Sequence, residues 1–166
     1  MTAKGLIAKG IAGDSDARAA VYQKYYGDVY RYCVYRTGSL YDAEDAAQET
    51  FLRLYRYSDI QIKNPKAYIL KVASNVCSDY FRHHSSTCEL DESIPAHMEV
   101  DEDQQAVRRA IAALPDDARE IIILYYYNDL KLSHIAEILS LPLSTVKSRL
   151  VRGRLKLKQI LIQEGF

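Results

Sequence analysis

Residues 130–158 read LKLSHIAEILSLPLSTVKSRLVRGRLKLK. This stretch holds two short helical patterns, in which apolar residues such as Ile135 and Val146 recur at the spacing of one buried helix face. Pro142 stands between the two patterns, where it prevents the first helix from continuing but suits the start of the next. This arrangement predicts a helix-turn-helix.

The second of these helices is strongly basic. Its Lys and Arg residues follow one another without an intervening acid, and they are Lys147, Arg149, Arg152, Arg154, Lys156 and Lys158. Such a helix repels itself unless water or a polyanion surrounds it, and nucleic acid is the commonest polyanion.

In a helix-turn-helix bound to DNA, the N-terminal end of the second helix enters the major groove. Lys and Arg can reach guanine acceptors there, and hydroxyl groups can hold phosphates. The outward-facing candidates near that end are Ser144, Thr145, Lys147, Ser148 and Arg152. The alternative is a solvated amphipathic helix whose charges only face water. We favour DNA binding because the turn, the small residue Ala136 and the basic cluster occur together.

The net charge of zero conceals a segregation of charge along the chain. Residues 1–84 carry a net charge of +3, residues 85–107 carry −7, and residues 108–166 carry +4. Two mildly basic blocks are therefore joined by an acidic segment. The hydrophobic content of 48% is sufficient for packed cores.

Helical periodicity extends over most of the chain, and no alternation typical of strands occurs. In residues 17–36 an apolar residue recurs at every fourth position from Val21 to Cys33. Asn64 followed by Pro65 marks the start of another helix, and a further pattern resumes at Gln104. We therefore predict an all-α protein. Its two small helical domains, 1–84 and 104–166, are joined by an acidic linker at 85–103.

The cysteines and the N-terminal residues indicate where in the cell the protein is found. Cys33, Cys77 and Cys88 form an odd set without paired spacing, which is typical of free thiols in a reducing cytosol. The first residues contain no apolar run long enough for a signal peptide, and no stretch approaches the length of a membrane span. We expect a cytoplasmic protein without membrane insertion.

The sequence contains no clear signal for metal binding or catalysis. Cys77, His83, His84 and Cys88 could in principle bind zinc, but their spacing is not a standard one and Cys77 lies on a buried stripe. No Ser/His/Asp set, Gly-rich phosphate loop or paired carboxylate motif stands out. We expect no metal site, no cofactor and no enzymatic activity.

Residues 113–161 resemble the C-terminal DNA-binding domain, region four, of bacterial sigma factors. The fragment TVKSRL at 145–150 is close to the sequence that this family usually has there. Residues 42–57, DAEDAAQETFLRLYRY, resemble the region-two helix that docks on the clamp of RNA polymerase. Residues 67–84 resemble the next helix, which reads and opens the downstream promoter element. In the order of these motifs and in its short length, the chain resembles members of the extracytoplasmic-function group of sigma factors.

The resemblance implies partners and a role for particular positions. The partners are core RNA polymerase and promoter DNA, and an anti-sigma factor is left open as a third. The positions that match the clamp-binding face are Asp45, Gln48, Glu49, Leu52 and Arg53. Those that match the site for the downstream element and the melted strand are Lys63, Lys66, Lys71 and Asn75, with the loop 58–64. Those that match the reader of the upstream element are Ser144, Thr145, Lys147, Ser148, Arg149 and Arg152.

Some positions depart from the family pattern. Ser74 stands where the family usually has Arg, which puts one phosphate contact in doubt, and Lys131 and Ser140 weaken the capping of the helix between them. Arg149 could pair internally and therefore ranks below Lys147. Two alternative functions remain, a helix-turn-helix regulator that acts without polymerase and a helical adaptor. Such a regulator has no need of the helix at 42–57, and an adaptor would show no promoter dependence.

Overall fold

The computed structural model describes residues 1–56, 63–83 and 101–166, and within these ranges every regular element is helical. The elements are α1 (Ala3–Ile11), α2 (Ser15–Thr37), α3 (Leu40–Leu54), α4 (Pro65–His83), α5 (Glu102–Ala112), α6 (Asp116–Ile122), the π-helical segment η1 (Ile123–Tyr127), α7 (Leu132–Leu139) and α8 (Leu143–Gln163). The prediction of an all-α fold is confirmed.

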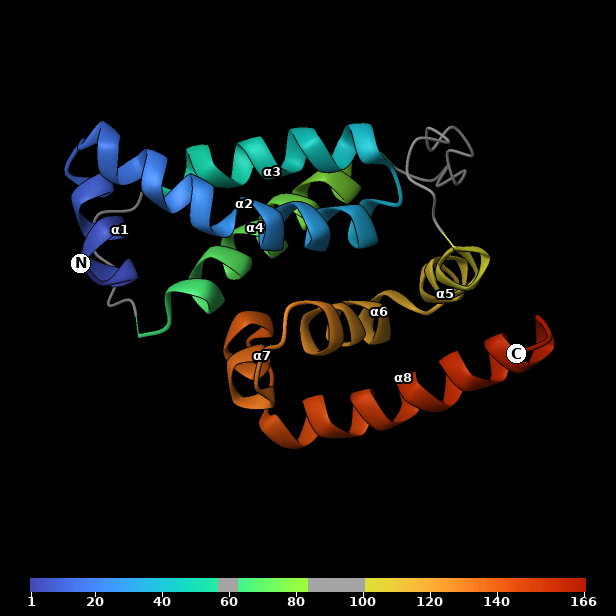
Figure 1. Cartoon of the computed structure of the whole chain (residues 1–166). Helices are drawn as coiled ribbons and strands as arrows, with labels where there is room; N and C mark the ends of the chain where they lie inside the picture. The colour runs from blue at the N-terminus through green and yellow to red at the C-terminus, as the bar shows by residue number, and fades with distance from the viewer. Residues whose placement is uncertain (57–62, 84–100) are drawn as a thin grey trace.

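The helices form two packed groups, an N-terminal group of α1–α4 and a C-terminal group of α5–α8 (Figure 1). In the N-terminal group α2 packs against α1, α3 and α4. In the C-terminal group α6 lies between α8 and the N-terminal group (Figure 1). The apolar stripe expected on α2 is buried along its whole length, from Val21 to Cys33.

A side-chain cap and a glycine mark the two ends of α2, and a second side-chain cap marks the start of α4. The carboxylate of Asp14 accepts hydrogen bonds from the backbone N–H groups of Asp16 and Ala17 at 3.0 and 3.1 Å, which caps α2. Gly38 ends that helix in the left-handed conformation at φ 72°, which residues with a Cβ rarely adopt. Asn64 caps α4 by accepting from the N–H of Ala67 at 2.9 Å.

Helix α1 was not expected from the sequence. Thr2 caps it by accepting from the N–H of Gly5 at 3.2 Å, and Ile7 is buried in the core of the N-terminal group. A short helix that contains two glycines has low intrinsic propensity, so its stability depends on packing against α2. Helix α5 begins at Glu102, two residues before the periodicity resumes, because Asp101 caps it.

The helix that begins at Asp116 changes to a π-helix at Ile123. The four consecutive residues from Ile121 to Leu124 are all buried. Both sides of this segment are covered, because α8 packs on one side and α2 on the other. A helix that is apolar all round is stable only when it is covered in this way.

Gly10 permits the close approach of α1 to Tyr55. A Cβ at this position would lie 2.5 Å from Cε1 of the Tyr55 ring. The ring cannot move away freely, because the Arg18 guanidinium lies 4.7 Å from its centroid and Arg18 Nε donates to the carbonyl of Gly10 at 2.7 Å.

We predict that Gly10→Ala lowers the free energy of unfolding by about 1–3 kcal/mol through overpacking, measured by urea denaturation. The matched control is Gly27→Ala within α2, because a Cβ at Gly27 meets no atom within 4 Å. That control should be neutral, or should stabilise the chain by up to about 1 kcal/mol through helix propensity. Equal stability of the two variants would contradict the packing of α1 against Tyr55.

Candidate functional site

The helix-turn-helix expected at 130–158 is present as α7 and α8. Between the two helices Ser140 adopts the left-handed conformation at φ 53°, and the N–H of Leu141 donates to the carbonyl of Ala136 at 3.0 Å. Lys131 provides no side-chain cap for α7, as expected from the sequence. Gly153 brings α8 close to α6, because a Cβ there would lie 3.4 Å from Cβ of Ala118.

The outward face of α8 carries the residues predicted to contact DNA. Ser144, Lys147, Ser148 and Arg152 are exposed, whereas Thr145 is half-buried. The hydroxyl of Ser148 donates to the carbonyl of Thr145 at 3.0 Å, but its oxygen can still accept a hydrogen bond. The face therefore presents two cations and hydroxyl groups in the first turns of the helix, where a recognition helix meets base edges.

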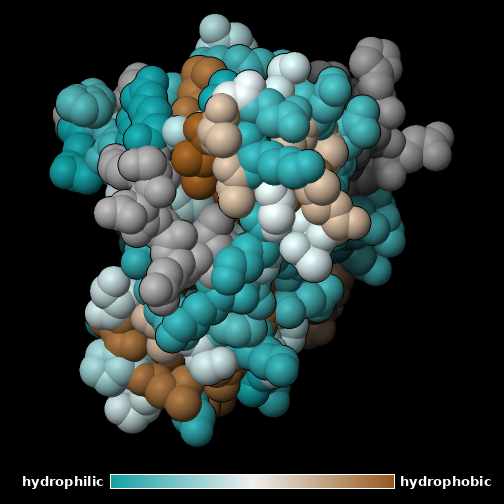
Figure 2. Space-filling view, turned by 90° about the vertical axis from the view of Figure 1, so that its left-hand side faces the viewer, coloured by the Kyte–Doolittle hydropathy of each residue, from teal (hydrophilic) through white to brown (hydrophobic). Residues whose placement is uncertain are grey.

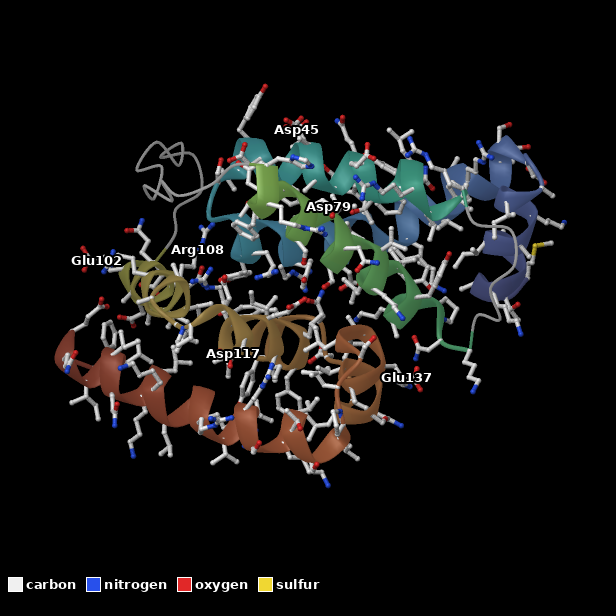
Figure 3. The ribbon with its side chains drawn as sticks, turned by 180° about the vertical axis from the view of Figure 1, so that it is seen from behind. Asp45, Asp79, Glu102, Arg108, Asp117 and Glu137 are labelled. Atoms are coloured by element: carbon white, nitrogen blue, oxygen red, sulfur yellow. The ribbon has the colours of Figure 1, made fainter. Side chains whose placement is uncertain are left out.

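Two other cations of α8 contact neighbouring helices. Arg149 is half-buried, and its Nε lies 3.9 Å from the carboxylate of Asp117, which points from α6 toward α8 (Figure 3). Arg154 donates to the hydroxyl of Tyr126 at 2.5 Å and lies 5.4 Å from the ring centroid of Tyr125. Arg149 and Arg154 therefore help to hold α8 against α6 and η1.

The outer face of α3 presents three of the residues predicted to bind the polymerase clamp. Asp45 projects away from the molecule (Figure 3), Gln48 is exposed, and the side chain of Leu52 is 62% exposed. Their spacing places them on one face of the helix.

A groove next to Leu52 was not anticipated from the sequence. It lies between α2 and α3 and is lined by Arg18, Tyr22, Gln48, Phe51, Leu52 and Arg56, among others. The ring of Tyr22 is exposed but held in place, because it packs 4.9 Å from Phe51 and 4.8 Å from Tyr26, measured between centroids. The end of the molecule where α2 begins and α3 ends shows hydrophobic side chains among hydrophilic ones (Figure 2). In the sequence, Tyr22 falls outside the apolar positions that form the buried stripe of α2. An aromatic residue at such a position is the signal that could have indicated the groove.

The other two residues predicted for the clamp, Glu49 and Arg53, are engaged within the protein. Arg53 Nε donates to Glu49 at 2.8 Å, and Arg53 Nη1 donates to Asp79 of α4 at 2.6 Å. These hydrogen bonds, first to Asp79 and then to Glu49, raise the pKa of Arg53, and the bond from Arg53 lowers the pKa of Asp79. Asp79 lies between α4 and α3 (Figure 3), so Arg53 joins these two helices.

The residues predicted to hold the melted strand differ in their surroundings. Lys71 and Asn75 are exposed one turn apart on α4, and Lys63 is exposed just before it. Lys66 instead lies 3.5 Å from the carboxylate of Asp28. Residues 58–62 of the predicted loop, and residues 85–100 of the acidic linker, lie outside the described residues.

Two findings concern metals and membranes. Within the described residues no group of His, Cys, Asp and Glu side chains could hold a metal ion, and His84 and Cys88 lie outside those residues. None of the helices that the structure describes is long and apolar enough to cross a membrane.

Comparison with known proteins finds two family models that match separate parts of the chain. The family model for sigma-70 region 2 matches residues 21–87, and the model for sigma-70 region 4 matches residues 104–157. The ECF RNA polymerase sigma factor SigW of Bacillus subtilis is 31% identical over 89% of this chain and 90% of its own length. SigM of the same organism is 30% identical over 84% of this chain and 92% of its own length.

Solved structures share the fold. The structure of CnrH in complex with the cytosolic domain of CnrY aligns with a TM-score of 0.76 at 21% identity, and covers 96% of this chain and 97% of CnrH. The sigma factor RpoE of Bartonella quintana, solved with the anti-sigma factor NepR, aligns with a TM-score of 0.71 at 20% identity. That alignment covers 84% of this chain and 93% of the solved one.

We predict that Arg53→Ala lowers the free energy of unfolding by about 1 kcal/mol, because it removes hydrogen bonds that join α3 to α4. The loss should be smaller when Asp79 is already replaced by Ala, and a double-mutant cycle of thermal unfolding measures this coupling. Additive effects of the two substitutions would show that the Arg53–Asp79 contact does not support the packing.

Proposed function

This chain belongs to the extracytoplasmic-function (ECF) group of RNA polymerase sigma factors, and we propose that α3 and α8 divide the work of such a factor between polymerase and promoter. The chain binds core RNA polymerase and directs promoter-specific transcription initiation. The division is supported by one observation above all. The exposed faces of α3 and α8 lie on opposite sides of the molecule (Figure 1).

At the polymerase end, we propose that Leu52 and the adjacent groove receive the clamp. Leu52 supplies an apolar anchor, Tyr22 supplies a fixed aromatic wall, and Arg18 and Arg56 form a charged rim. Interfaces commonly combine an apolar centre with a polar rim, and aromatic and Arg side chains carry much of the binding energy. Asp45 and Gln48 would extend the contact along α3.

At the promoter end, the first turns of α8 would enter the major groove of the upstream element. Lys147 and Arg152 would contact base edges or phosphates, and Ser144, Thr145 and Ser148 would supply further hydrogen bonds. Arg149 would contribute less, because it lies near Asp117.

At the downstream element, Lys63 and Lys71 would neutralise phosphates and Asn75 would pair with a base edge. Lys66 would have to leave Asp28 before it could do the same. The protein would position polymerase on the promoter and help to open the DNA strands. Strands open when an extruded base binds the protein more favourably than it stacks on its neighbours in the duplex. We therefore propose that the chain has no catalytic activity of its own.

Three further assignments belong to this proposal. The proposed domains are 1–84 and 104–166 with the linker 85–103 between them, and this break is supported by the family matches, of which one ends at residue 87 and the next begins at residue 104. Core polymerase is found in the cytoplasm, which supports a cytoplasmic location. An anti-sigma factor is a proposed third partner, because RpoE of Bartonella quintana, which shares the fold, was solved with one. A regulator independent of polymerase would leave the match to region 2 without a role.

We predict that Lys147→Ala with Arg152→Ala lowers promoter-specific run-off transcription by purified core polymerase about a hundredfold or more. Each contact to a base or phosphate contributes about 1–3 kcal/mol. Core binding, measured by fluorescence anisotropy, should be unchanged. The control removes the same charge from α1, by Lys4→Ala with Lys9→Ala. Equal loss of core binding would contradict the division of work, and no specific initiation by the unmodified chain on a pool of genomic fragments would contradict the function.

We predict that Leu52→Ala weakens core binding about tenfold or more, as expected for an apolar anchor in an interface. The free energy of unfolding should change by less than about 0.5 kcal/mol, because the side chain is on the surface. Leu155→Ala is the matched control, since Leu155 is 58% exposed on α8. If both variants bind core polymerase equally well, Leu52 does not lie in the interface.

A further inference from the structure

Two buried cysteines face each other inside the N-terminal group of helices. Cys33 lies on α2 and Cys77 on α4, and both residues are 0% exposed. The Sγ–H of Cys77 donates a hydrogen bond to Sγ of Cys33, with the two sulfur atoms 3.9 Å apart. The residues are 44 positions apart in the chain, so the packing of α2 against α4 brings them together. Neither thiol has a part in the proposed contacts with polymerase or DNA.

The pair is close to the geometry that a disulfide requires. In a disulfide the two sulfur atoms are about 2 Å apart. The sulfur atoms of Cys33 and Cys77 already touch, so rotation of the side chains and a small approach of the two helices would close the remaining distance. Among the residues that the structure describes, these two are the free cysteines.

A buried cation lies about one helical turn from Cys33. Arg36 is 5% exposed, and within the described residues its Nε and Nη1 have no hydrogen-bond partner. The hydrogen bond from Cys77 and burial raise the pKa of Cys33 well above its ordinary value, whereas the charge of Arg36 acts in the opposite direction. Because the thiolate is the reactive form, the pair reacts slowly while the helices are packed.

Both thiols lie near the ends of their helices, where a packed chain opens most readily. Cys33 is about one turn from the end of α2, and Cys77 is less than two turns from the end of α4. The guanidinium of Arg36 lies 5.2 Å from the ring centroid of Phe81, a contact that joins these two ends. Brief unwinding of the last turns would admit a molecule as small as hydrogen peroxide.

We propose that Cys33 and Cys77 form an oxidative modification site, at which a peroxide converts the two thiols into a disulfide that ties α2 to α4. One sulfur attacks the peroxide, the O–O bond breaks, and the products are a sulfenic acid and one water. The second sulfur then attacks the sulfenic sulfur, the S–S bond forms, and a second water leaves with the remaining thiol proton. Two electrons pass from the sulfur atoms to the peroxide.

The consequence of this oxidation rests on the proposed function, because α4 is the helix proposed to meet the downstream element. Cys77 lies on the buried side of α4, whereas Lys71 and Asn75 lie on its exposed side. Drawing the sulfur atoms together moves α4 relative to α2, and it therefore displaces these two residues. Since hydrogen bonds weaken steeply when their geometry changes, oxidation should impair initiation. The exposed face of α3 should still bind polymerase.

The test uses the full chain with Cys88→Ser, in which Cys33 and Cys77 are the remaining thiols. The folded chain is treated with hydrogen peroxide, catalase removes the excess, and the chain is denatured and alkylated without reductant. Mass spectrometry should show a monomer that has lost two hydrogen atoms and takes up no alkyl group. Tryptic peptides from α2 and α4 should be joined, and dithiothreitol should restore both alkylation sites.

The matched controls are Cys33→Ala and Cys77→Ala, each in the Cys88→Ser chain. Each control keeps a single thiol and cannot form the product. The rate of disulfide formation in the test chain should rise severalfold in urea below the unfolding transition, because urea favours local opening. Full alkylation after peroxide, sulfinic acids in place of the disulfide, or dimers joined between chains would overturn the site. Disulfide formation confined to the unfolded chain would also overturn it.

The functional consequence is measured by run-off transcription, with core polymerase added after the peroxide has been removed. The oxidised Cys88→Ser chain should initiate severalfold less than the same chain after reduction, with an unchanged dissociation constant for core polymerase. Neither alanine control should respond to the treatment. Equal initiation by the oxidised and reduced chains would overturn the consequence for DNA. If the reduced chain does not bind polymerase at all, the proposed function fails, whereas the masses still decide whether the disulfide forms.

Discussion

The carboxylate of Glu120, whose side chain is only 13% exposed, joins the two groups of helices through directional contacts. It lies on the seven-residue helix α6, and its partners Tyr32 and Ser74 come from two different helices of the N-terminal group. The apolar residues from Ile121 to Leu124 follow directly and are covered on both sides. Burial of the apolar run stabilises the packing but does not select one orientation. The hydrogen bonds to Glu120 are directional, and they select the orientation of the two groups.

This arrangement gives α4 two roles in the proposed function. One face of the helix carries Lys71 and Asn75 toward solvent, and the neighbouring face carries Ser74 into the contact with Glu120. The side of α3 proposed to meet polymerase and the outer side of α8 are exposed as well. In this arrangement the surfaces proposed for polymerase, for the downstream element and for the upstream element therefore all face solvent.

The sequence predicts the parts of this molecule that depend on local interactions. The cap Asn64, the turn before α8 and the buried stripe of α2 were all expected from spacing and residue type. The contacts of Glu120 join residues 88 and 46 positions apart, and local patterns carry no information about such pairs. The same reason explains why the engagement of Arg53 with Asp79, 26 positions away, was not anticipated. Helix α1 was missed because packing, not propensity, stabilises it.

The distance between the two groups in solution shows whether Glu120 fixes their arrangement. Fluorophores attached through non-natural amino acids at the exposed positions Gln23 on α2 and Gln159 on α8 would report this distance by single-molecule energy transfer. We expect one short distance in the wild-type chain and a broader distribution in the Glu120→Ala variant, which lacks the hydrogen bonds from Tyr32 and Ser74. The same distribution in both proteins would contradict the role given to Glu120.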